Sequence, residues 1–198
     1  MKILAFTDPH GNEQIIREVI KLAKLKKPDL IICPGDLTIF EKNLSEILEK
    51  LNKIKIPLLV IPGNHEEAGD MKKICDKFEN IIYLHRGIFE INDYVFFGYG
   101  GDGFSSENKE FEKVAKSVEK RIKGKKVVLI THQPPYGNKL DNLEYFDHVG
   151  NKSYRKFIEK NKPMLALSGH LHENFGAMDK IGKTIIINPG PLGKLIKI

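Results

Sequence analysis

The chain has 198 residues, a length that favours a single domain, residues 1–198, with a sizeable core of its own. Hydrophobic residues make up 41% and charged residues 29%, a balance that argues against disordered, fibrous and membrane-spanning classes. The longest apolar runs, 30–33 and 58–61, are far shorter than the ~20 residues of a membrane helix. The opening apolar stretch ends at Asp8, too early for a secretion signal. We therefore expect a cytoplasmic protein with no membrane partner.

The charge balance is basic, with 32 Lys and Arg against 26 Asp and Glu and a net charge of +6. Only four of these cations are arginines, whereas proteins that read base edges depend on the arginine fork. The lysines are spread along the chain, which favours a solvated surface over a nucleic-acid interface. The two cysteines, Cys33 and Cys75, form no CxxC pair, so we expect reduced thiols in a core.

The first third of the chain alternates strand and helix patterns. Apolar runs predict strands at 2–6, 29–33 and 57–61. Apolar residues at helical spacing predict one helix from about Asn12 and a second around 44–51. Repeated strand–helix units favour parallel strands joined by right-handed crossovers.

The rest of the chain predicts a more varied order. Short strands are expected at 81–84, 87–91 and 94–98, followed by a long amphipathic helix through 111–122. The remaining expected elements are a strand at 126–131, a helix at 151–161, a strand at 164–168, a hairpin of 174–179 with 183–188 that turns at 180–182, and a last strand at 193–197. No repeat or linker interrupts this order, so the pattern predicts an α/β fold with mixed β-sheets.

Polar clusters follow five of the predicted strands. They are Asp8-Pro9-His10-Gly11, Gly35-Asp36, Gly63-Asn64-His65-Glu66, His132 and Gly169-His170-Leu171-His172. Ligands in α/β folds bind at the carboxyl ends of the strands, so five clusters there indicate one site. Turn formation explains any one cluster taken alone. However, five of the seven histidines fall inside these clusters, which favours a shared chemical role.

These side chains suit divalent cations. Asp8 and His10 can reach one ion from a single turn, and Asp36 stands where a carboxylate could bridge two ions. Imidazole, carboxylate and amide donors without thiolate fit Mn, Fe, Zn, Ni or Co better than a structural zinc site. The pattern therefore predicts a metal site at the strand ends.

The ordered motifs resemble those of the calcineurin-like metallophosphoesterase superfamily, namely DxH, GD, GNH[ED], H and GHxH. They stand here as Asp8-Pro9-His10, Gly35-Asp36, Gly63-Asn64-His65-Glu66, Thr131-His132 and Gly169-His170-Leu171-His172. The stretches 131–135 and 148–153 resemble a prokaryotic branch of Icc-type phosphodiesterases. The resemblance implies a four-layer αββα sandwich with a dimetal site at the strand ends.

The resemblance also implies roles for individual residues. One divalent ion would be held by Asp8, His10, Asp36 and His172, and the second by Asp36, Asn64, His132 and His170. Mn is the first expectation for both ions, with Fe, Ni, Zn, Co or Mg as alternatives. A metal-bridging hydroxide would attack phosphorus in line, and His65 would be the general acid that protonates the leaving oxygen.

Two departures from the phosphoprotein phosphatase motifs narrow the expected substrate. The family motifs GDxxDRG and GNHExR place an aspartate and an arginine where this chain has Ile39 and Ala68. Loss of the arginine removes a bidentate phosphate clamp. We therefore expect a small phosphate ester as substrate, a phosphodiester or a phosphomonoester. The alternatives are a nuclease that uses the same site on DNA or RNA and a metal-stabilised scaffold for a partner protein.

Four features lie outside the motifs. Residues 98–103 match GxGxxG but lack the expected context of a following parallel strand with an acidic end, so we expect a flexible loop at the rim of the site. Residues 132–150 form a long loop after a ligand, a place where specificity elements lie. His148 in that loop is a candidate substrate contact, with an ordinary loop histidine as the alternative. His85 has no motif around it and is expected to be structural.

Overall fold

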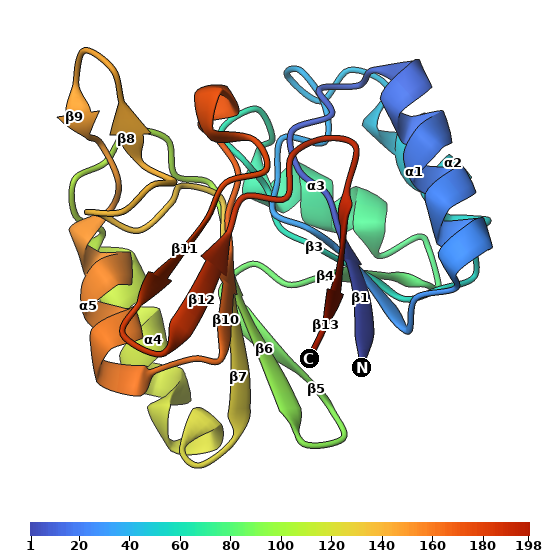
Figure 1. Ribbon diagram of the computed structural model, residues 1–198. Helices are drawn as coiled ribbons and strands as arrows, with labels where there is room; N and C mark the ends of the chain where they lie inside the picture. The colour runs from blue at the N-terminus through green and yellow to red at the C-terminus, as the bar shows by residue number, and fades with distance from the viewer.

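Two β-sheets pack face to face in the computed structural model, and helices cover the outer side of each sheet (Figure 1). The structure describes all residues, 1–198. The first sheet has the order β13 (Lys194–Lys197), β1 (Lys2–Ala5), β2 (Leu30–Cys33), β3 (Leu58–Val60) and β4 (Ile81–Tyr83). Only β13 runs antiparallel to its neighbour.

The second sheet also has parallel strands at its centre. Its order is β11 (Met178–Ile181), β12 (Thr184–Ile187), β10 (Leu165–Leu167), β7 (Lys126–Thr131), β6 (Tyr94–Tyr99) and β5 (Gly87–Ile91). The two edge strands, β11 and β5, are antiparallel to the strands beside them. The mixed α/β fold class predicted from the sequence is confirmed.

Three layers of core lie between the four layers of backbone. Helices α1 (Glu13–Lys26), α2 (Leu44–Asn52) and α3 (Ala68–Cys75) pack on the first sheet, and α4 (Lys109–Ile122) and α5 (Lys152–Asn161) pack on the second. Strand alternation divides the core: Leu4 and Phe6 face the helices, whereas Ile3 and Ala5 face the other sheet. The result is an αββα sandwich, as the resemblance implied.

Local signals explain where α1 begins and ends. The Asn12 side chain accepts hydrogen bonds from the backbone N–H groups of Gln14 and Ile15, which satisfies two donors of the first turn. The helix ends where Lys27 adopts a left-handed conformation, with φ of 45°. Its buried residues, Ile16, Val19 and Ala23, repeat at helical spacing and face the core.

Several elements differ from the sequence prediction. Helix α3 was not predicted, because it is short and buries only Met71 and Cys75. The predicted strand at 174–179 is wrong at its start: residues 172–174 form a single 3₁₀ turn, η1, and β11 begins at Met178. Asn174 is held there because its side chain donates hydrogen bonds to the carbonyls of Leu140 and Asn142.

The loop at 132–150 also contains structure that its sequence did not predict. Two short strands, β8 (Asn142–Leu143) and β9 (Asp147–His148), form a separate antiparallel hairpin. It projects from the same end of the molecule as the five polar clusters (Figure 1). None of the helices is both long enough and apolar enough to cross a bilayer.

Candidate metal centre

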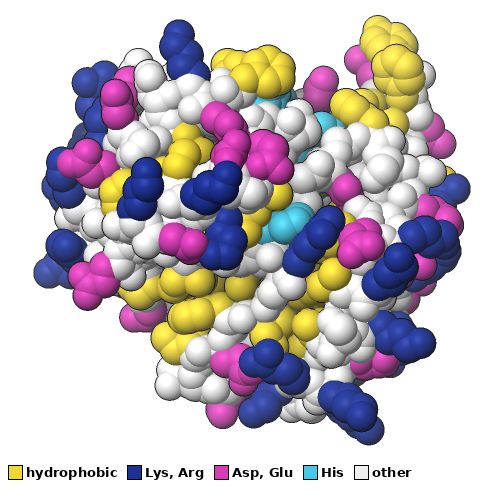
Figure 2. Space-filling model, turned by 180° about the vertical axis from the view of Figure 1, so that it is seen from behind, with side chains coloured by type: hydrophobic (Ala, Val, Ile, Leu, Met, Phe, Trp, Pro, Cys, Tyr) yellow, Lys and Arg dark blue, Asp and Glu magenta, His cyan; other side chains and the backbone are white.

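The five polar clusters meet at one end of the sandwich. Those of Asp8, Asp36 and Asn64 follow β1, β2 and β3 of the first sheet. Those of His132 and His170 follow β7 and β10 of the second sheet. Histidine side chains are visible between hydrophobic ones along the upper edge of Figure 2. Both sheets therefore contribute to one site, because their parallel central strands end on the same side.

The backbone in these loops is tightly bent. Four non-glycine residues of the clusters adopt left-handed conformations, with φ of 53° at Asp8, 47° at His10, 50° at Asp36 and 69° at His170. Such conformations cost free energy and persist where the surroundings enforce them, typically at functional sites. The loops enforce one another, since the Asp8 N–H donates to the Gly35 carbonyl at 3.2 Å and the His10 N–H to the Asp36 carbonyl at 3.1 Å.

Asp8, His10 and His172 form the first group of donor atoms. The two Nε2 atoms of His10 and His172 are 3.0 Å apart, and they lie 4.0 and 3.7 Å from Asp8 Oδ1. Asp8 is held by a hydrogen bond from the Thr7 hydroxyl and by the His170 N–H. Three potential ligand atoms thus converge on a space within 4.8 Å.

Asp36, His132 and His170 form the second group, and Asn64 lies beside it. His132 is fully buried, and its Nε2 lies 3.4 Å from Asp36 Oδ2 and 3.0 Å from Asn64 Oδ1. Nδ1 of the same ring donates to the Pro34 carbonyl at 2.9 Å. Because a carbonyl only accepts, Nδ1 carries a proton, and the neutral ring then has its lone pair on Nε2.

Asp36 joins the two groups. Its Oδ2 is 3.8 Å from His10 Nε2 and 3.4 Å from His132 Nε2. The Asp36 side chain is almost completely buried, and its Oδ1 accepts the His65 N–H at 3.0 Å. One carboxylate oxygen therefore faces donor atoms of both groups.

The electrostatics of the site call for positive charge. Burial is the largest single influence on the pKa of Asp36 and raises it, but the hydrogen bonds and charges of His132 and His65 together outweigh burial and lower the pKa below its usual value. Burial of His132 acts to lower its pKa, whereas the hydrogen bond and charge of Asp36 raise it to about 9. Nε2 of His132 faces two acceptor oxygens, Asp36 Oδ2 and Asn64 Oδ1. The lone pairs of these three atoms repel one another unless a proton or a metal cation lies between them.

Nitrogen atoms without partners support the same conclusion. Nε2 of His170 and Nδ1 of His10 are buried and make no hydrogen bond. Burial lowers the pKa of His170 to about 4, and that of His10 also lies below its usual value, so both rings are neutral near pH 7. Neutral imidazole is the form that binds metals. The donor set therefore fits divalent cations.

Glu66 has a role that its motif alone did not reveal. Its buried carboxylate accepts the N–H groups of Asp36, Thr38 and Gly63, at 3.1, 2.8 and 2.8 Å. Burial raises its pKa, although these hydrogen bonds oppose the shift. Glu66 thus ties the loop after β2 to the loop after β3, and the signal in the sequence was an acidic residue two positions after Asn64.

His65 lies at the edge of the centre. Its Nε2 is 4.0 Å from Asp36 Oδ2, and its ring packs edge-on against the exposed Phe40, with centroids 4.8 Å apart. Nδ1 of His65 has no hydrogen-bond partner. This agrees with the sequence, which has Ile39 where the phosphoprotein phosphatases have an aspartate.

The remaining predicted features lie beside the centre. Gly103 passes next to His170, and the ring of Phe104 is 4.5 Å from the ring of His170, so the end of the 98–103 segment lies at the rim, whereas Gly98 and Tyr99 are buried in β6 and not in a loop. The parallel strand that follows, β7, pairs with β6 but ends at Thr131 with no acidic residue, so the context of a dinucleotide motif is indeed missing. His148 is not among the converging donors, and its Nδ1 bonds Asp141 at 2.9 Å.

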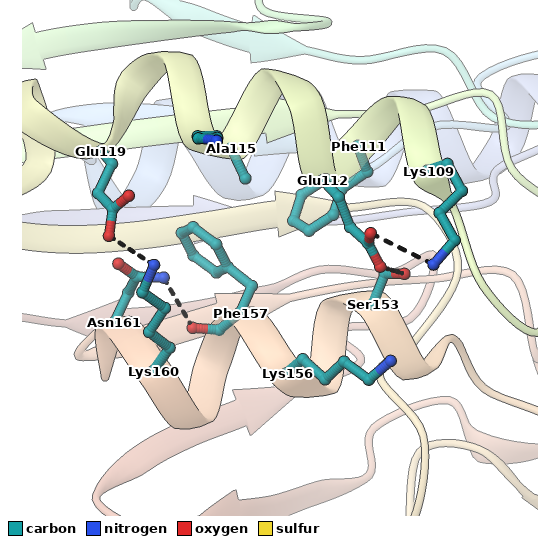
Figure 3. A pocket seen from close by; sticks show the side chains of 11 residues that line it. Lys109, Phe111, Glu112, Ala115, Glu119, Ser153, Lys156, Phe157, Lys160 and Asn161 are labelled. Atoms are coloured by element: carbon teal, nitrogen blue, oxygen red, sulfur yellow. Dashed lines mark hydrogen bonds and ion pairs between the residues drawn. The ribbon is translucent and has the colours of Figure 1, made fainter.

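A separate groove lies between α4 and α5, away from the five polar clusters. It has a volume of ≈ 500 Å³, and Figure 3 shows the paired side chains that line it, such as Glu119 with Lys160 at 2.6 Å. It contains none of the converging Asp and His residues. The chemistry therefore points to the strand ends and not to this groove.

The sequence matches the family described as "Calcineurin-like phosphoesterase" over residues 1–174. The chain belongs to the calcineurin-like phosphoesterase family. Members are phosphoric ester hydrolases that use divalent metal ions, and the Asp and His groups of this chain are candidate sites for such ions. The resemblance inferred from the motifs is confirmed.

Individual relatives agree with this membership. The chain is 32% identical to the uncharacterized protein MJ1162 of Methanocaldococcus jannaschii, over 96% of this chain and 88% of the relative. It is 26% identical to a probable glycerophosphodiester phosphodiesterase of Arcobacter nitrofigilis, over 85% of this chain and 66% of that protein. The crystal structure of TT1561 of Thermus thermophilus superimposes with a TM-score of 0.81 at 18% identity, over 96% of this chain and 89% of that one, which shows a shared fold.

Proposed function

We propose that this calcineurin-like phosphoesterase hydrolyses phosphodiesters of small molecules with two divalent cations. The observation that carries the proposal is the position of Asp36 Oδ2 between His10 Nε2 and His132 Nε2, as expected for a carboxylate shared by two ions. The first ion would be held by Asp8, His10, Asp36 and His172. The second would be held by Asp36, Asn64, His132 and His170.

Bound there, the two ions would supply Lewis acidity toward the phosphoryl oxygens and a nucleophilic hydroxide at neutral pH. The chain's own residues orient the reaction. Asp36 accepts the His65 N–H, which places the His65 ring at the edge of the centre. We assign the protonation of the leaving oxygen to this ring.

The environment of His65 suits this role. The ring lies beside the donor groups and is partly exposed, so a substrate can reach it. No carboxylate bonds Nδ1 of His65. The chain also has Ala68 at the position where the phosphoprotein phosphatases have an arginine. Both features favour a small ester over a phosphoprotein. The similarity to the Arcobacter relative, a probable glycerophosphodiester phosphodiesterase, supports a diester.

Mn is the metal we propose first, with Fe, Ni, Zn, Co and Mg as the alternatives to be compared. We also propose that residues 1–198 work as one domain, because loops of both sheets supply the donor atoms. Location in the cytoplasm stays a prediction.

The test is hydrolysis by purified protein loaded with each metal in turn. Bis-p-nitrophenyl phosphate reports diesterase activity and p-nitrophenyl phosphate reports monoesterase activity. We expect the diester to be cleaved faster, and Asp36→Asn to abolish both activities while the circular dichroism spectrum is retained. Folded, Mn-loaded protein that cleaves neither compound would refute the proposal. Binding to DNA or RNA that falls steeply with salt would favour the nuclease alternative.

A further inference from the structure

A hollow of ≈ 360 Å³ lies next to the metal centre, and we call it the Phe104 hollow. Its walls include Phe104, Ser106, Tyr136, His148 and Lys152. The volume is within the range of small-molecule sites, which are lined by aromatic groups and a few placed polar ones. None of these residues belongs to the groups of converging donors.

Phe104 connects this hollow to the metal centre. Its ring is one wall of the hollow and lies 4.5 Å, between centroids, from the ring of His170. The preceding residue, Gly103, passes beside both His170 and Asn64. A group attached to a phosphorus atom at the metal centre therefore has a short path into the Phe104 hollow.

The walls are aromatic and positively charged. Phe104 is 70% exposed, so its ring is accessible to a ligand. The rings of Tyr136 and His148 are 5.6 Å apart, and the Lys152 ammonium lies 5.1 Å from the centre of the Tyr136 ring. Aromatic faces next to a cation favour a planar, electron-rich group.

A buried carboxylate, that of Asp141, fixes the orientation of the His148 ring. Asp141 is fully buried and accepts the N–H groups of Gly137, Asn138 and Gly150. The same carboxylate accepts Nδ1–H of His148 at 2.9 Å. Nε2 of His148 therefore keeps its hydrogen-bonding capacity, since the nearest carboxylate, that of the exposed Asp147, is 3.9 Å away. Such a fixed ring can contact a polar ligand edge without losing much entropy.

A second hollow beside the centre differs in charge from the Phe104 hollow. This second hollow, of ≈ 310 Å³, is lined by Phe40 and His65 together with three glutamates, Glu41, Glu66 and Glu67. A diester would thus meet acidic groups on the side of His65 and a cation on the side of His170. This difference gives the substrate a preferred direction.

We propose that the Phe104 hollow binds a planar aromatic group on the half of the diester that stays on phosphorus. The ring would stack on Phe104 and Tyr136, with His148 Nε2 and the Lys152 ammonium at its polar edge. The inference deepens the proposed function and rests on it, because His65 is taken to face the half that leaves. A nucleobase and a simple aryl ring share this chemistry.

Three diesters with the same leaving group test the proposal. They are the p-nitrophenyl esters of thymidine 5′-phosphate, phenyl phosphate and methyl phosphate, and each releases p-nitrophenol. We expect kcat/KM for the thymidine and phenyl diesters to exceed that for the methyl diester about tenfold or more, since stacking of one base contributes a factor of this size. A thymidine diester faster than the phenyl diester would identify a nucleobase, and equal rates would identify a simple ring. Equal kcat/KM for all three diesters would overturn the proposal.

Variants assign the effect to the hollow. Phe104→Ala and Tyr136→Ala should each reduce the ratio of aromatic to methyl kcat/KM several-fold, mainly through KM. Lys156→Ala is the matched control for Lys152→Ala, because Lys156 is one turn further along α5 and pairs with Glu107. A ratio that falls equally in both lysine variants would contradict the assignment of Lys152.

Direct binding separates this inference from the proposed function. Titration calorimetry of Mn-loaded protein with thymidine 5′-monophosphate and with methyl phosphate requires no turnover. Tighter binding of the nucleotide, lost in Tyr136→Ala, supports the hollow even if no diester is cleaved. Equal binding of the two ligands refutes the hollow even if diesters are cleaved.

Discussion

Gly63 lies directly against Asp36. A Cβ atom at Gly63 would overlap the Asp36 carboxylate and come within 2.5 Å of the Asp36 backbone nitrogen. The loop after β3 can approach the loop after β2 this closely only because position 63 carries no side chain. This contact places Asn64 and His65 beside the carboxylate that joins the two donor groups.

Gly63→Ala should therefore damage stability and the site together. We expect a loss of about 1–3 kcal/mol in the free energy of unfolding, because the backbone or Asp36 must move. Urea unfolding followed by circular dichroism measures this loss. Gly87→Ala is the control, since a Cβ there would lie 3.9 Å from its nearest neighbour. An equal effect of the two substitutions would contradict the importance of the contact.

Glu66→Ala should destabilise the protein more than the loss of a surface acid. The backbone N–H groups of Asp36, Thr38 and Gly63 would lose their acceptor, and each unsatisfied buried group costs ~1–3 kcal/mol. Glu66→Gln should retain part of the stability because it keeps one oxygen. Glu67→Ala, which removes only the α3 cap to the Asp70 N–H, should cost ~1 kcal/mol in the same urea experiment. Equal losses for Glu66→Ala and Glu67→Ala would contradict the bracing role of Glu66.

Substitution of His65 should affect esters according to their leaving groups. If His65 protonates the leaving oxygen, His65→Gln should slow hydrolysis of an alkyl or phenyl ester by roughly 10²–10⁴-fold. Release of p-nitrophenolate, a weak base, should be slowed much less. Steady-state kcat on the two kinds of ester gives the comparison. The same loss on both would indicate that His65 positions Asp36 or a metal instead.

Metal ions should stabilise the fold through both sheets. A ligand at 100 times its dissociation constant adds ~2.7 kcal/mol to the free energy of unfolding. We therefore expect Mn²⁺ to raise the melting temperature of protein treated with a chelator. The increase should be much smaller in Asp36→Asn, because Asp36 faces both donor groups. Differential scanning calorimetry tests this, and an undiminished increase in the variant would argue against a shared carboxylate.

His85 should make stability depend on pH away from the metal centre. Burial lowers the pKa of His85 to about 4, and its Nδ1 accepts the Gly100 N–H at 3.0 Å. The unfolded chain has a histidine pKa of about 6.5, so between pH 6.5 and 4 it binds a proton that the folded chain does not. The contribution of His85 to the free energy of unfolding is therefore fully present above pH 6.5, and it is lost as the pH falls from 6.5 to 4.

His85→Gln keeps a hydrogen-bond acceptor but no titrating group. In metal-free protein, it should reduce by nearly one the number of protons taken up on unfolding in this range. The slope of the free energy of unfolding against pH should fall in proportion. Urea unfolding at pH 4.5, 5.5 and 6.5 measures the slope. Identical slopes for the two proteins would show that His85 is not the group concerned.

Much of the fold could be predicted from local patterns. The strand at 30–33 is a continuous apolar run, the strand at 126–131 contains one at 127–130, and the helix through 111–122 has a clear apolar face, so their types were correctly predicted. Helix α3 and the β8–β9 hairpin were missed. Both are short and bury few apolar side chains, so tertiary contacts and not periodicity decide them.

The sequence by itself determined the family and predicted the residues of the candidate metal centre. Motifs such as Asp8-Pro9-His10 and Gly169-His170-Leu171-His172 consist of consecutive residues, so they can be recognised without a structure. Only the tertiary structure decided that Asp36 lies between His10 and His132, that Glu66 ties two loops together, and that Asp141 holds His148. These relationships join residues far apart in the chain. They depend on how two sheets pack and how strained loops meet, and no short-range pattern encodes those distances.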